Sequence, residues 1–259
     1  MVTLDRPPAN AMNRSAVRRI GEIFLQIAER EDPPPVVITG AGGRFYSAGG
    51  DIKELEGVGR SEIDGRMRDF HAMLVAMDRY PRPVVAAVNG FCVGGGVELA
   101  SFADVVLAAP HARFGFPEIR HGLLPAEKGI ARVIRVIGMR AARELLLSGD
   151  LIGAEQATTL GLVDTVVEPD RLVAEAVSRA QAEGGKAPVL YAALKRAVNN
   201  ISEADDERWS GLTLRQVAAY FDDPVARSLR ERWSRSPKVK PSTPSHTSPG
   251  ASRQEASSA

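Results

Sequence analysis

Two short apolar segments, each followed directly by a glycine-rich turn, most constrain what this chain can fold into. Residues 36–39 read VVIT and lead into GAGGRFYSAGGD, and residues 83–88 read PVVAAV and lead into NGFCVGGG. Short, continuous runs of β-branched residues predict buried strands. If the two strands are parallel neighbours in a sheet, their glycine turns lie side by side at the same edge.

Helices alternate with these strands in the first half of the chain. Apolar residues spaced three and four apart predict a helix over 13–29, and a second helix over 61–80 ends at Pro81. A further strand is predicted over 104–109, so the alternation favours an α/β architecture. The rest is predicted to be helical apart from a strand at 162–167, with helices over 126–137, 139–147, 154–159, 171–183, 189–199, 205–220 and 225–233.

The chain is predicted to consist of a core over 1–185, a helical region over 186–233 and a tail over 234–259. The tail is rich in Ser, Pro, Thr and Lys and lacks apolar periodicity, which predicts disorder. Basic residues lead into this tail, and such residues can attract a phosphate or a nucleic acid. A solvated helix end that runs into a tail explains them more simply, so a nucleic-acid partner is not expected.

Several classes of protein are excluded by composition and motifs. Of the 259 residues only Cys92 is a cysteine, which excludes an internal disulfide, fits a reducing cytoplasm and is typical of a small buried hydrophobe. No apolar run approaches the roughly 20 residues of a membrane span. The first glycine loop has Phe45 where a dinucleotide-binding loop needs its third glycine. Scattered histidines predict no metal site: His71, His111, His121 and His246.

The second glycine turn is expected to open a helix near Gly94 or Gly95. Backbone N–H groups at a helix start have no partner within the helix, and the helix dipole favours negative charge there. Two such groups aimed at one point form an oxyanion hole, in which a single donor contributes on the order of 3 kcal/mol to transition-state stabilisation.

Two glutamates follow this turn in apolar surroundings. Glu98 comes three residues after Gly95, and Glu118 lies in FGFPEI. A buried carboxylate is costly unless it is paired, protonated or used in chemistry, so an ion pair with an arginine and a catalytic role are both open for Glu98. Two carboxyls beside an oxyanion hole suit proton transfer alpha to a carbonyl and water chemistry beta to it. Burial is expected to raise both pKa values into a useful range.

Four segments occur in an order that is typical of one family: SAGGDIKEL (47–55), VNGFCVGGGVELA (88–100), FGFPEIRHGLLP (114–125) and GLVDTVV (161–167). With them the chain resembles the crotonase superfamily, or enoyl-CoA hydratase/isomerase family, over residues 1–233. The resemblance implies an α/β fold built as a spiral of ββα units, with a C-terminal helical trimerisation region. It also implies a trimer or a dimer of trimers, and a first strand that is clipped in this chain.

The resemblance assigns roles to individual residues. The N–H groups of Gly50 and Gly95 would form the oxyanion hole for a thioester carbonyl. Glu98 would activate the water that adds at Cβ, and Glu118 would deliver the proton to Cα. Backbone groups around Ser47, Ala48 and Gly50 would hold the CoA adenine, so the substrate is an acyl-CoA and no separate cofactor is implied.

Residue differences between branches of the family reduce the number of reactions that this chain is expected to catalyse. Dienoyl-CoA isomerases and aryl-CoA dehalogenases carry an aspartate where this chain has Ala126, and Δ3,Δ2-enoyl-CoA isomerases generally lack an acid matching Glu98. The resemblance therefore favours a cytoplasmic enoyl-CoA hydratase or 3-hydroxyacyl-CoA dehydratase. Alternatives are an isomerase, a specialised acyl-CoA dehydratase or lyase, and a non-catalytic CoA- or RNA-binding member.

One departure from the family leaves the substrate open. After Pro125 the family usually continues with small residues, whereas this chain reads AEKG. Glu127 and Lys128 are interpreted either as an exposed helix start or as groups that recognise a polar acyl chain. Arg230 and Arg232 are candidates for contacts with the CoA phosphates.

Overall fold

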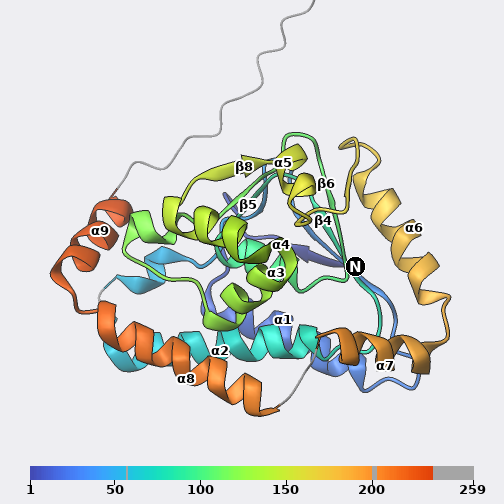
Figure 1. The fold of residues 1–259 in the computed structure, drawn as a ribbon, viewed down its shortest axis with the longest axis horizontal. Helices are drawn as coiled ribbons and strands as arrows, with labels where there is room; N and C mark the ends of the chain where they lie inside the picture. Colours follow the sequence, from blue (N-terminus) through green and yellow to red (C-terminus); the bar gives the residue numbers. More distant parts are fainter. Residues whose placement is uncertain (57, 200–202, 236–259) are drawn as a thin grey trace, which may run out of the picture.

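A computed structural model describes residues 1–56, 58–199 and 203–235 (Figure 1). Its larger sheet is entirely parallel, with the strand order β1-β2-β4-β6-β9. The two strands predicted to be neighbours are adjacent, and Val36 lies opposite Val84, which confirms the prediction. The strands of this sheet are β1 (Val2–Leu4), β2 (Val36–Gly40), β4 (Val84–Val88), β6 (Val105–Ala108) and β9 (Thr165–Val166).

A second, smaller sheet lies inside the segments that were predicted to be loops. Its order is β3-β5-β7-β8, and its strands are β3 (Phe45–Ser47), β5 (Phe91–Val93), β7 (Arg113–Gly115) and β8 (Leu151–Gly153). Strands of three residues are too short to show a two-residue hydrophobic period, so the sequence pattern could not reveal them. The chain passes three times from a strand of the larger sheet, through one of the smaller sheet, into a helix. It therefore repeats a ββα unit.

The predicted helices are confirmed, with their ends shifted by a few residues at most. Two turns of 3-10 helix, η1 (Ile52–Leu55) and η2 (Pro117–His121), follow the first glycine loop and β7. Gly138 interrupts α4 with a φ of 78°, where two separate helices were expected. The helices are α1 (Arg14–Ala28), α2 (Arg60–Asp78), α3 (Gly95–Ser101), α4 (Glu127–Ser148), α5 (Ala154–Thr159), α6 (Leu172–Gly184), α7 (Pro188–Asn199), α8 (Glu203–Tyr220) and α9 (Pro224–Arg235).

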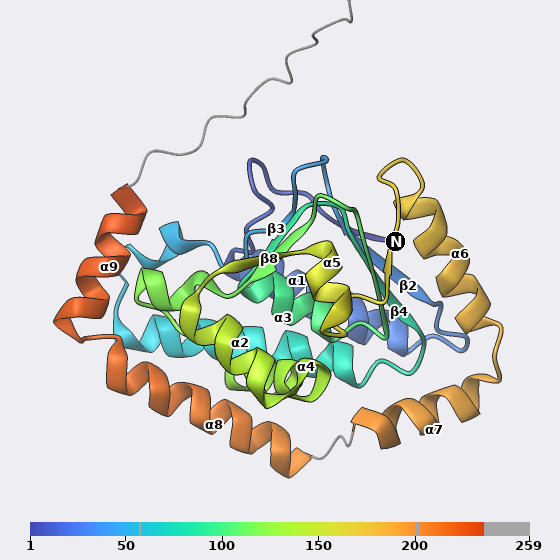
Figure 2. The ribbon, with the colours of Figure 1, turned by 45° about the horizontal axis from the view of Figure 1, so that its top comes forward.

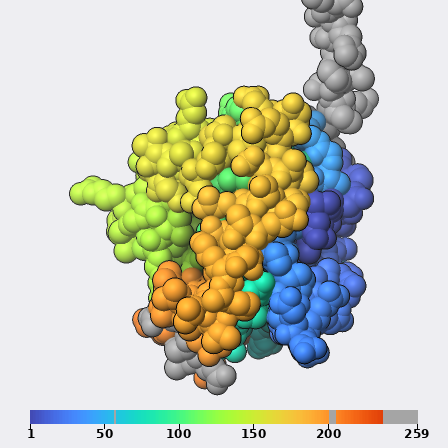
Figure 3. Space-filling view, turned by 90° about the vertical axis from the view of Figure 1, so that its right-hand side faces the viewer, coloured from blue at the N-terminus to red at the C-terminus, as the bar shows by residue number. Residues whose placement is uncertain are grey.

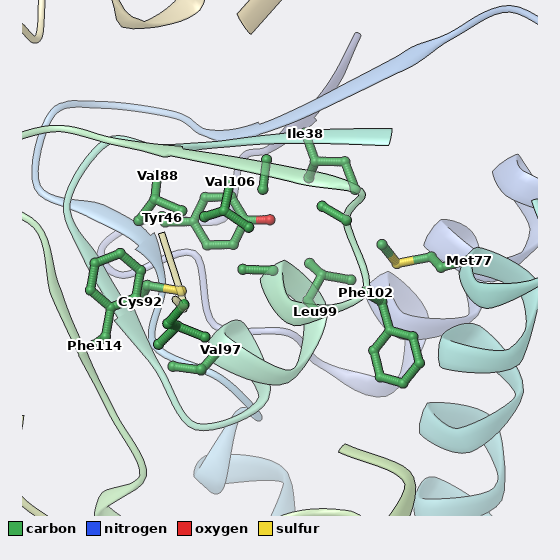
Figure 4. Close-up of a cluster of buried hydrophobic side chains, with 14 of the residues drawn as sticks. Ile38, Tyr46, Met77, Val88, Cys92, Val97, Leu99, Phe102, Val106 and Phe114 are labelled. Atoms are coloured by element: carbon green, nitrogen blue, oxygen red, sulfur yellow. The ribbon is translucent and has the colours of Figure 1, made fainter. Parts of the chain in front are cut away.

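The larger sheet is buried on both faces. Alternate residues, such as Ile38 and Val106, point into the main core with Leu99 and Phe102 of the α3 region (Figure 4). The other face packs against α6, which runs with α7 along one side of the molecule (Figure 3). Cys92 is fully buried in the main core, as predicted. This burial is typical of parallel sheets, since the helices that connect parallel strands cover both faces.

The C-terminal helices wrap around the outside of this core (Figures 1 and 2). α8 packs on α2 and α4, and α9 contacts both η1 and η2. The helical region extends through Arg235, and the remainder of the predicted tail, 236–259, lies outside the described residues. Within the described ranges, no helix has the length and apolar character needed to cross a membrane.

Candidate active site

The two glycine turns touch each other at the edge of the sheets. A Cβ atom on Gly49 would lie 2.9 Å from the backbone N of Gly95, and Gly49 has a φ of 81°. The Met12 N–H donates to the Gly49 oxygen at 2.7 Å, and the Asp51 N–H donates to the Met12 oxygen at 3.0 Å. These two bonds fix the first turn on either side of Gly50 and leave the Gly50 N–H free of them.

Each glycine of the triplet 94–96 serves a different purpose. Gly94 has a φ of 56°, and a Cβ there would overlap Glu118 Oε1. Gly95 faces Phe70, and a Cβ on Gly96 would come within 2.7 Å of the Ser47 oxygen. The cluster therefore allows a positive φ and a close carboxyl at Gly94, a close aromatic ring at Gly95 and a close strand at Gly96.

The two predicted oxyanion-hole residues open onto one cavity. Gly50 and Gly95 both line a cavity of about 320 Å³, together with Ala48, Glu98 and Glu118. In the part of the chain that the structure describes, neither glycine N–H donates a hydrogen bond to a protein atom. Two free backbone donors in one cavity fit an oxyanion.

Glu98 is buried in α3 with only 2% of its surface exposed. Its Oε1 accepts the Ala126 N–H at 3.3 Å, and Oε2 has no partner among the described residues. No ion pair involves Glu98 within these residues, so an arginine partner does not explain it. Burial, and then the charge of Glu118, raise the pKa of the Glu98 carboxyl well above its usual range.

Glu118 enters the same cavity from the first turn of η2. Pro117 starts this turn, and the Leu123 N–H closes it by donating to the Glu118 backbone oxygen at 3.0 Å. The side-chain Oε2 has no partner in the described part of the chain. Burial raises the pKa of the Glu118 carboxyl to about 7. The structure therefore brings both predicted acids to the two free amides.

The predicted CoA-binding residues separate into two environments. Ala48 and Gly50 line the cavity, whereas Ser47 lies beneath the turn with its side chain fully buried. The Ser47 hydroxyl donates to the Asn10 oxygen at 2.9 Å and accepts the Gly49 N–H at 3.1 Å. Its side chain therefore holds the turn in shape and does not face the cavity.

Sequence reasoning missed the aromatic side of the cavity and one glycine. Phe70, Tyr220, Phe221 and Trp233 line the cavity, and the last three come from the end of α8 and from α9 and its approach. The His121 ring stacks on Trp233 with ring centroids 4.0 Å apart. A Cβ on Gly129 would overlap Glu98 Oε2, so this glycine makes room for the carboxyl. Only its place in the unusual AEKG segment marked it in the sequence.

The charges of the AEKG segment do not face the cavity. Lys128 is buried against Asp78 and Asp206, with Nζ–Oδ distances of 2.8 and 2.7 Å. Neither Glu127 nor Lys128 lines the cavity, so the structure does not support their role in reading an acyl group. Arg230 donates to the backbone oxygens of Gly122 and Phe221, so its guanidinium already binds protein carbonyls.

No set of three or more His, Cys, Asp or Glu side chains is placed to hold a metal ion in the described ranges. The cavity is lined by the two carboxyls, the two glycine turns and apolar side chains, and also by Arg14, Asp51, Arg66 and His121.

A repeated ββα unit with two facing glycine turns defines the crotonase fold, and comparison with known proteins identifies the family. The model of the Enoyl-CoA hydratase/isomerase family matches residues 1–228, so the chain belongs to the enoyl-CoA hydratase/isomerase family.

Individual relatives show the same relationship. The chain is 37% identical over 204 residues to a carnitinyl-CoA dehydratase of Escherichia coli (strain K12), covering 78% of this chain and 77% of that protein. It is 35% identical over 208 residues to a short-chain-enoyl-CoA hydratase of Clostridium acetobutylicum, covering 79% of both.

Solved structures agree with this assignment. A carnitinyl-CoA dehydratase from Mycobacterium avium superposes with a TM-score of 0.76 at 31% identity, covering 87% of this chain and 89% of that one. An enoyl-CoA hydratase/isomerase from Mycobacterium paratuberculosis gives 0.78 at 30% identity, with 89% and 92% covered. The predicted crotonase-like α/β fold is confirmed, while the trimerising role of the C-terminal helices stays a prediction.

Proposed function

We propose that this protein catalyses the reversible addition of water across the 2,3-double bond of an enoyl-CoA thioester. It would act as an enoyl-CoA hydratase or, in reverse, as a 3-hydroxyacyl-CoA dehydratase. The observation that carries the proposal is the meeting of two buried carboxyls, Glu98 and Glu118, with two free backbone amides in one cavity. Buried acids without cationic partners are costly to the fold, which is typical of groups retained for chemistry.

Each part of the site has a task in this reaction. The N–H groups of Gly50 and Gly95 would bind the thioester oxygen and stabilise the enolate-like charge that develops on it. Glu98 would take a proton from the water that adds at Cβ, and Glu118 would give its proton to Cα. In dehydration the same groups act in reverse, with Glu118 removing the α-proton and Glu98 protonating the departing hydroxyl.

The raised pKa values of the two glutamates support a site in which Glu98 and Glu118 share one proton. Burial raises the pKa of Glu118 to about 7, and burial together with the charge of Glu118 raises the pKa of Glu98 well above its usual range. A pair that holds one proton can carry it on Glu98, with Glu118 ionised. This arrangement is the starting state for dehydration, and moving that one proton to Glu118 gives the starting state for hydration.

The cavity lining supports an apolar acyl group. Ile63, Met67, Phe70 and Leu124 are among the residues that line it. The relatives, a short-chain-enoyl-CoA hydratase and carnitinyl-CoA dehydratases, support hydration or dehydration of a short acyl-CoA. The turn at Ala48 and Gly50 would hold CoA through backbone groups, and no further cofactor is required. Assembly as a trimer or a dimer of trimers and a cytoplasmic location stay predictions.

The proposal is tested by mixing the purified protein with trans-2-enoyl-CoAs of increasing length and following the loss of the conjugated thioester absorbance. Glu98→Gln and Glu118→Gln should each lower kcat by about 10²–10⁴-fold, since each removes a group that transfers a proton. Glu155→Gln, which changes an exposed glutamate of α5, is the matched control and should keep full activity.

Two outcomes would overturn the proposal. Full activity in both glutamine variants would show that the pair is not catalytic. Conversion of 3-enoyl-CoA to 2-enoyl-CoA without measurable water addition would instead identify an isomerase.

A further inference from the structure

A second cavity of about 230 Å³ lies directly beside the active-site cavity. Four residues line both cavities and therefore form a wall between them: Ile52, Leu55, Phe221 and Trp233. They come from η1, from the residue after α8, and from α9. The wall is thus built from segments far apart in the sequence, which meet because α9 packs against η1.

Specific contacts hold the two aromatic members of this wall. The Trp233 ring stacks on His121 with the ring planes 11° apart. The Arg230 guanidinium lies over the Phe221 ring, 4.5 Å from its centroid, and Phe221 also packs with Ile63 and Val217. Aromatic rings held on both sides in this way form a defined boundary.

The two sides of the wall differ in polarity. The active-site side continues into apolar residues such as Ile63, Met67 and Phe70. On the far side most of the lining residues are charged or polar: Glu56, Asp222, Arg227, Arg230, Glu231 and Ser234. An apolar chain that grows away from the acids therefore meets the wall before it reaches the polar cavity.

We propose that this wall sets the length of the acyl group that the protein accepts, and that Trp233 is its main specificity-determining residue. This inference rests on the proposed function, because it assigns the apolar part of the cavity to the acyl chain of a CoA thioester. Replacing the indole with a methyl group joins the two cavities. The joined cavity admits a chain several methylene groups longer.

The test measures binding of saturated acyl-CoAs of 4 to 14 carbons, which undergo no hydration, by titration calorimetry. For the wild-type protein, affinity should increase with chain length and then stop increasing. In Trp233→Ala the increase should continue, with about fourfold tighter binding for each further methylene that becomes buried. Trp209→Ala, which truncates the other tryptophan in the chain and changes neither cavity, should keep the wild-type limit.

A second variant changes a wall residue of η1 instead of α9. It provides a test that does not depend on whether α9 folds correctly in Trp233→Ala. Leu55→Ala leaves the stacked His121–Trp233 pair in place and should also move the limit to longer chains, by fewer carbons. Unchanged chain-length limits in both variants would overturn the inference. If the limits shift but no enoyl-CoA is hydrated, the proposed function fails while the acyl wall stands.

Discussion

Two sets of buried ionisable groups lie next to each other at the start of α4. One set has oppositely charged partners and the other has none. Ala126 and Gly129 face the carboxyl of Glu98, the first with its N–H and the second with its missing side chain. Between them Lys128 points the other way and reaches Asp78 and Asp206. Four consecutive residues therefore contact both an unpaired carboxyl site and a paired ionic cluster.

The two sets differ in how their charges are balanced. Lys128 binds two aspartates, and Arg79 binds Asp206 at 2.8 Å, so two positive and two negative groups share the cluster. This cluster ties α2, α4 and α8 together. The Glu98–Glu118 pair has no cation within the described residues. Buried charge by itself therefore does not point to a catalytic site, whereas a pair of buried carboxyls without a cationic partner is a candidate for one.

The largest effect is expected from removing the cation of the paired cluster, which should lower the free energy of unfolding. Lys128→Met leaves Asp78 without its cation inside the protein, and removing one partner of a buried pair costs about 3–5 kcal/mol. We expect the free energy of unfolding, measured by urea denaturation, to fall by that amount. Hydration activity per folded molecule should stay near that of the wild type, since Lys128 does not line the cavity.

Lys186→Met is the matched control, because Lys186 is exposed and its ion pair among the described residues is with the neighbouring Glu183. Its stability should change by less than about 0.5 kcal/mol. A Lys128→Met protein with wild-type stability would contradict the structural role of the cluster. Lost activity in a fully folded variant would instead connect Lys128 to the chemistry.

Gly129→Ala should affect the other set of charges. A Cβ at this position overlaps Glu98 Oε2, so the carboxyl must shift from its place in the cavity. We expect kcat to fall by about 100-fold, because displacement of a catalytic group by an ångström has effects of that size. Stopped-flow or steady-state hydration assays would measure the loss.

Gly211→Ala in α8 is the matched control for a glycine within a helix. Its Cβ would approach only the flexible end of Arg215, at 3.4 Å, and alanine favours the helix. This variant should be active and slightly more stable. Full activity of Gly129→Ala would show that Glu98 can act from another position.

Local patterns were sufficient to predict the strands of the larger sheet and the helices. The spacing of Val17, Ile20 and Phe24 marks one face of α1, and these residues are buried together. The three-residue strands of the smaller sheet left no such pattern, because only their pairing with one another makes them strands. Local patterns therefore predicted an α/β fold without its second layer, and only the resemblance to the family implied the ββα units.

The candidate site was predictable to the extent that it lies on short motifs. Gly50, Gly95, Glu98 and Glu118 all stand in segments that resemble the family, and the structure brings them to one cavity. Trp233 could not be assigned to it, since a tryptophan near the end of a helix has no local feature that tells which loop it will contact. The direction in which Lys128 points likewise depends on Asp206, which lies far along the chain.

The pH dependence of activity should reflect the ionisation of Glu98 and Glu118. Below about pH 7 Glu118 gains a proton and no longer acts as a base, and the raised pKa of Glu98 favours the protonated form of that carboxyl as well. We expect kcat/KM to decrease about tenfold for each pH unit below about 7, and to decrease again at high pH when the second proton leaves. A profile that stays flat down to pH 5 would contradict the assignment.

The same shift has a consequence for stability. Because folding raises the pKa of Glu118 from 4.5 to about 7, the folded protein holds more protons than the unfolded chain between these values. Stability therefore declines as the pH rises from about 4.5 to 7 and is not regained above it. Glu118→Gln should lack this contribution, so its thermal denaturation at pH 8 should occur at a higher temperature than that of the wild type.

The smallest expected effect is that of Glu127→Gln. This variant tests whether the charge of Glu127, at the start of α4 between the two sets of charges, takes part in substrate recognition. Glu127 is half-buried in the first turn, where its N–H donates to Thr213 Oγ1 at 3.0 Å and its carboxyl meets Gln216. Glutamine keeps these contacts and removes only a charge that favours the helix N-terminus, worth about 0.3–1 kcal/mol. We expect kcat and KM to stay within twofold for short apolar enoyl-CoAs, in steady-state assays. A tenfold rise in KM confined to acyl groups with a cationic substituent would contradict this prediction, because it would show that the carboxyl of Glu127 reads the substrate after all.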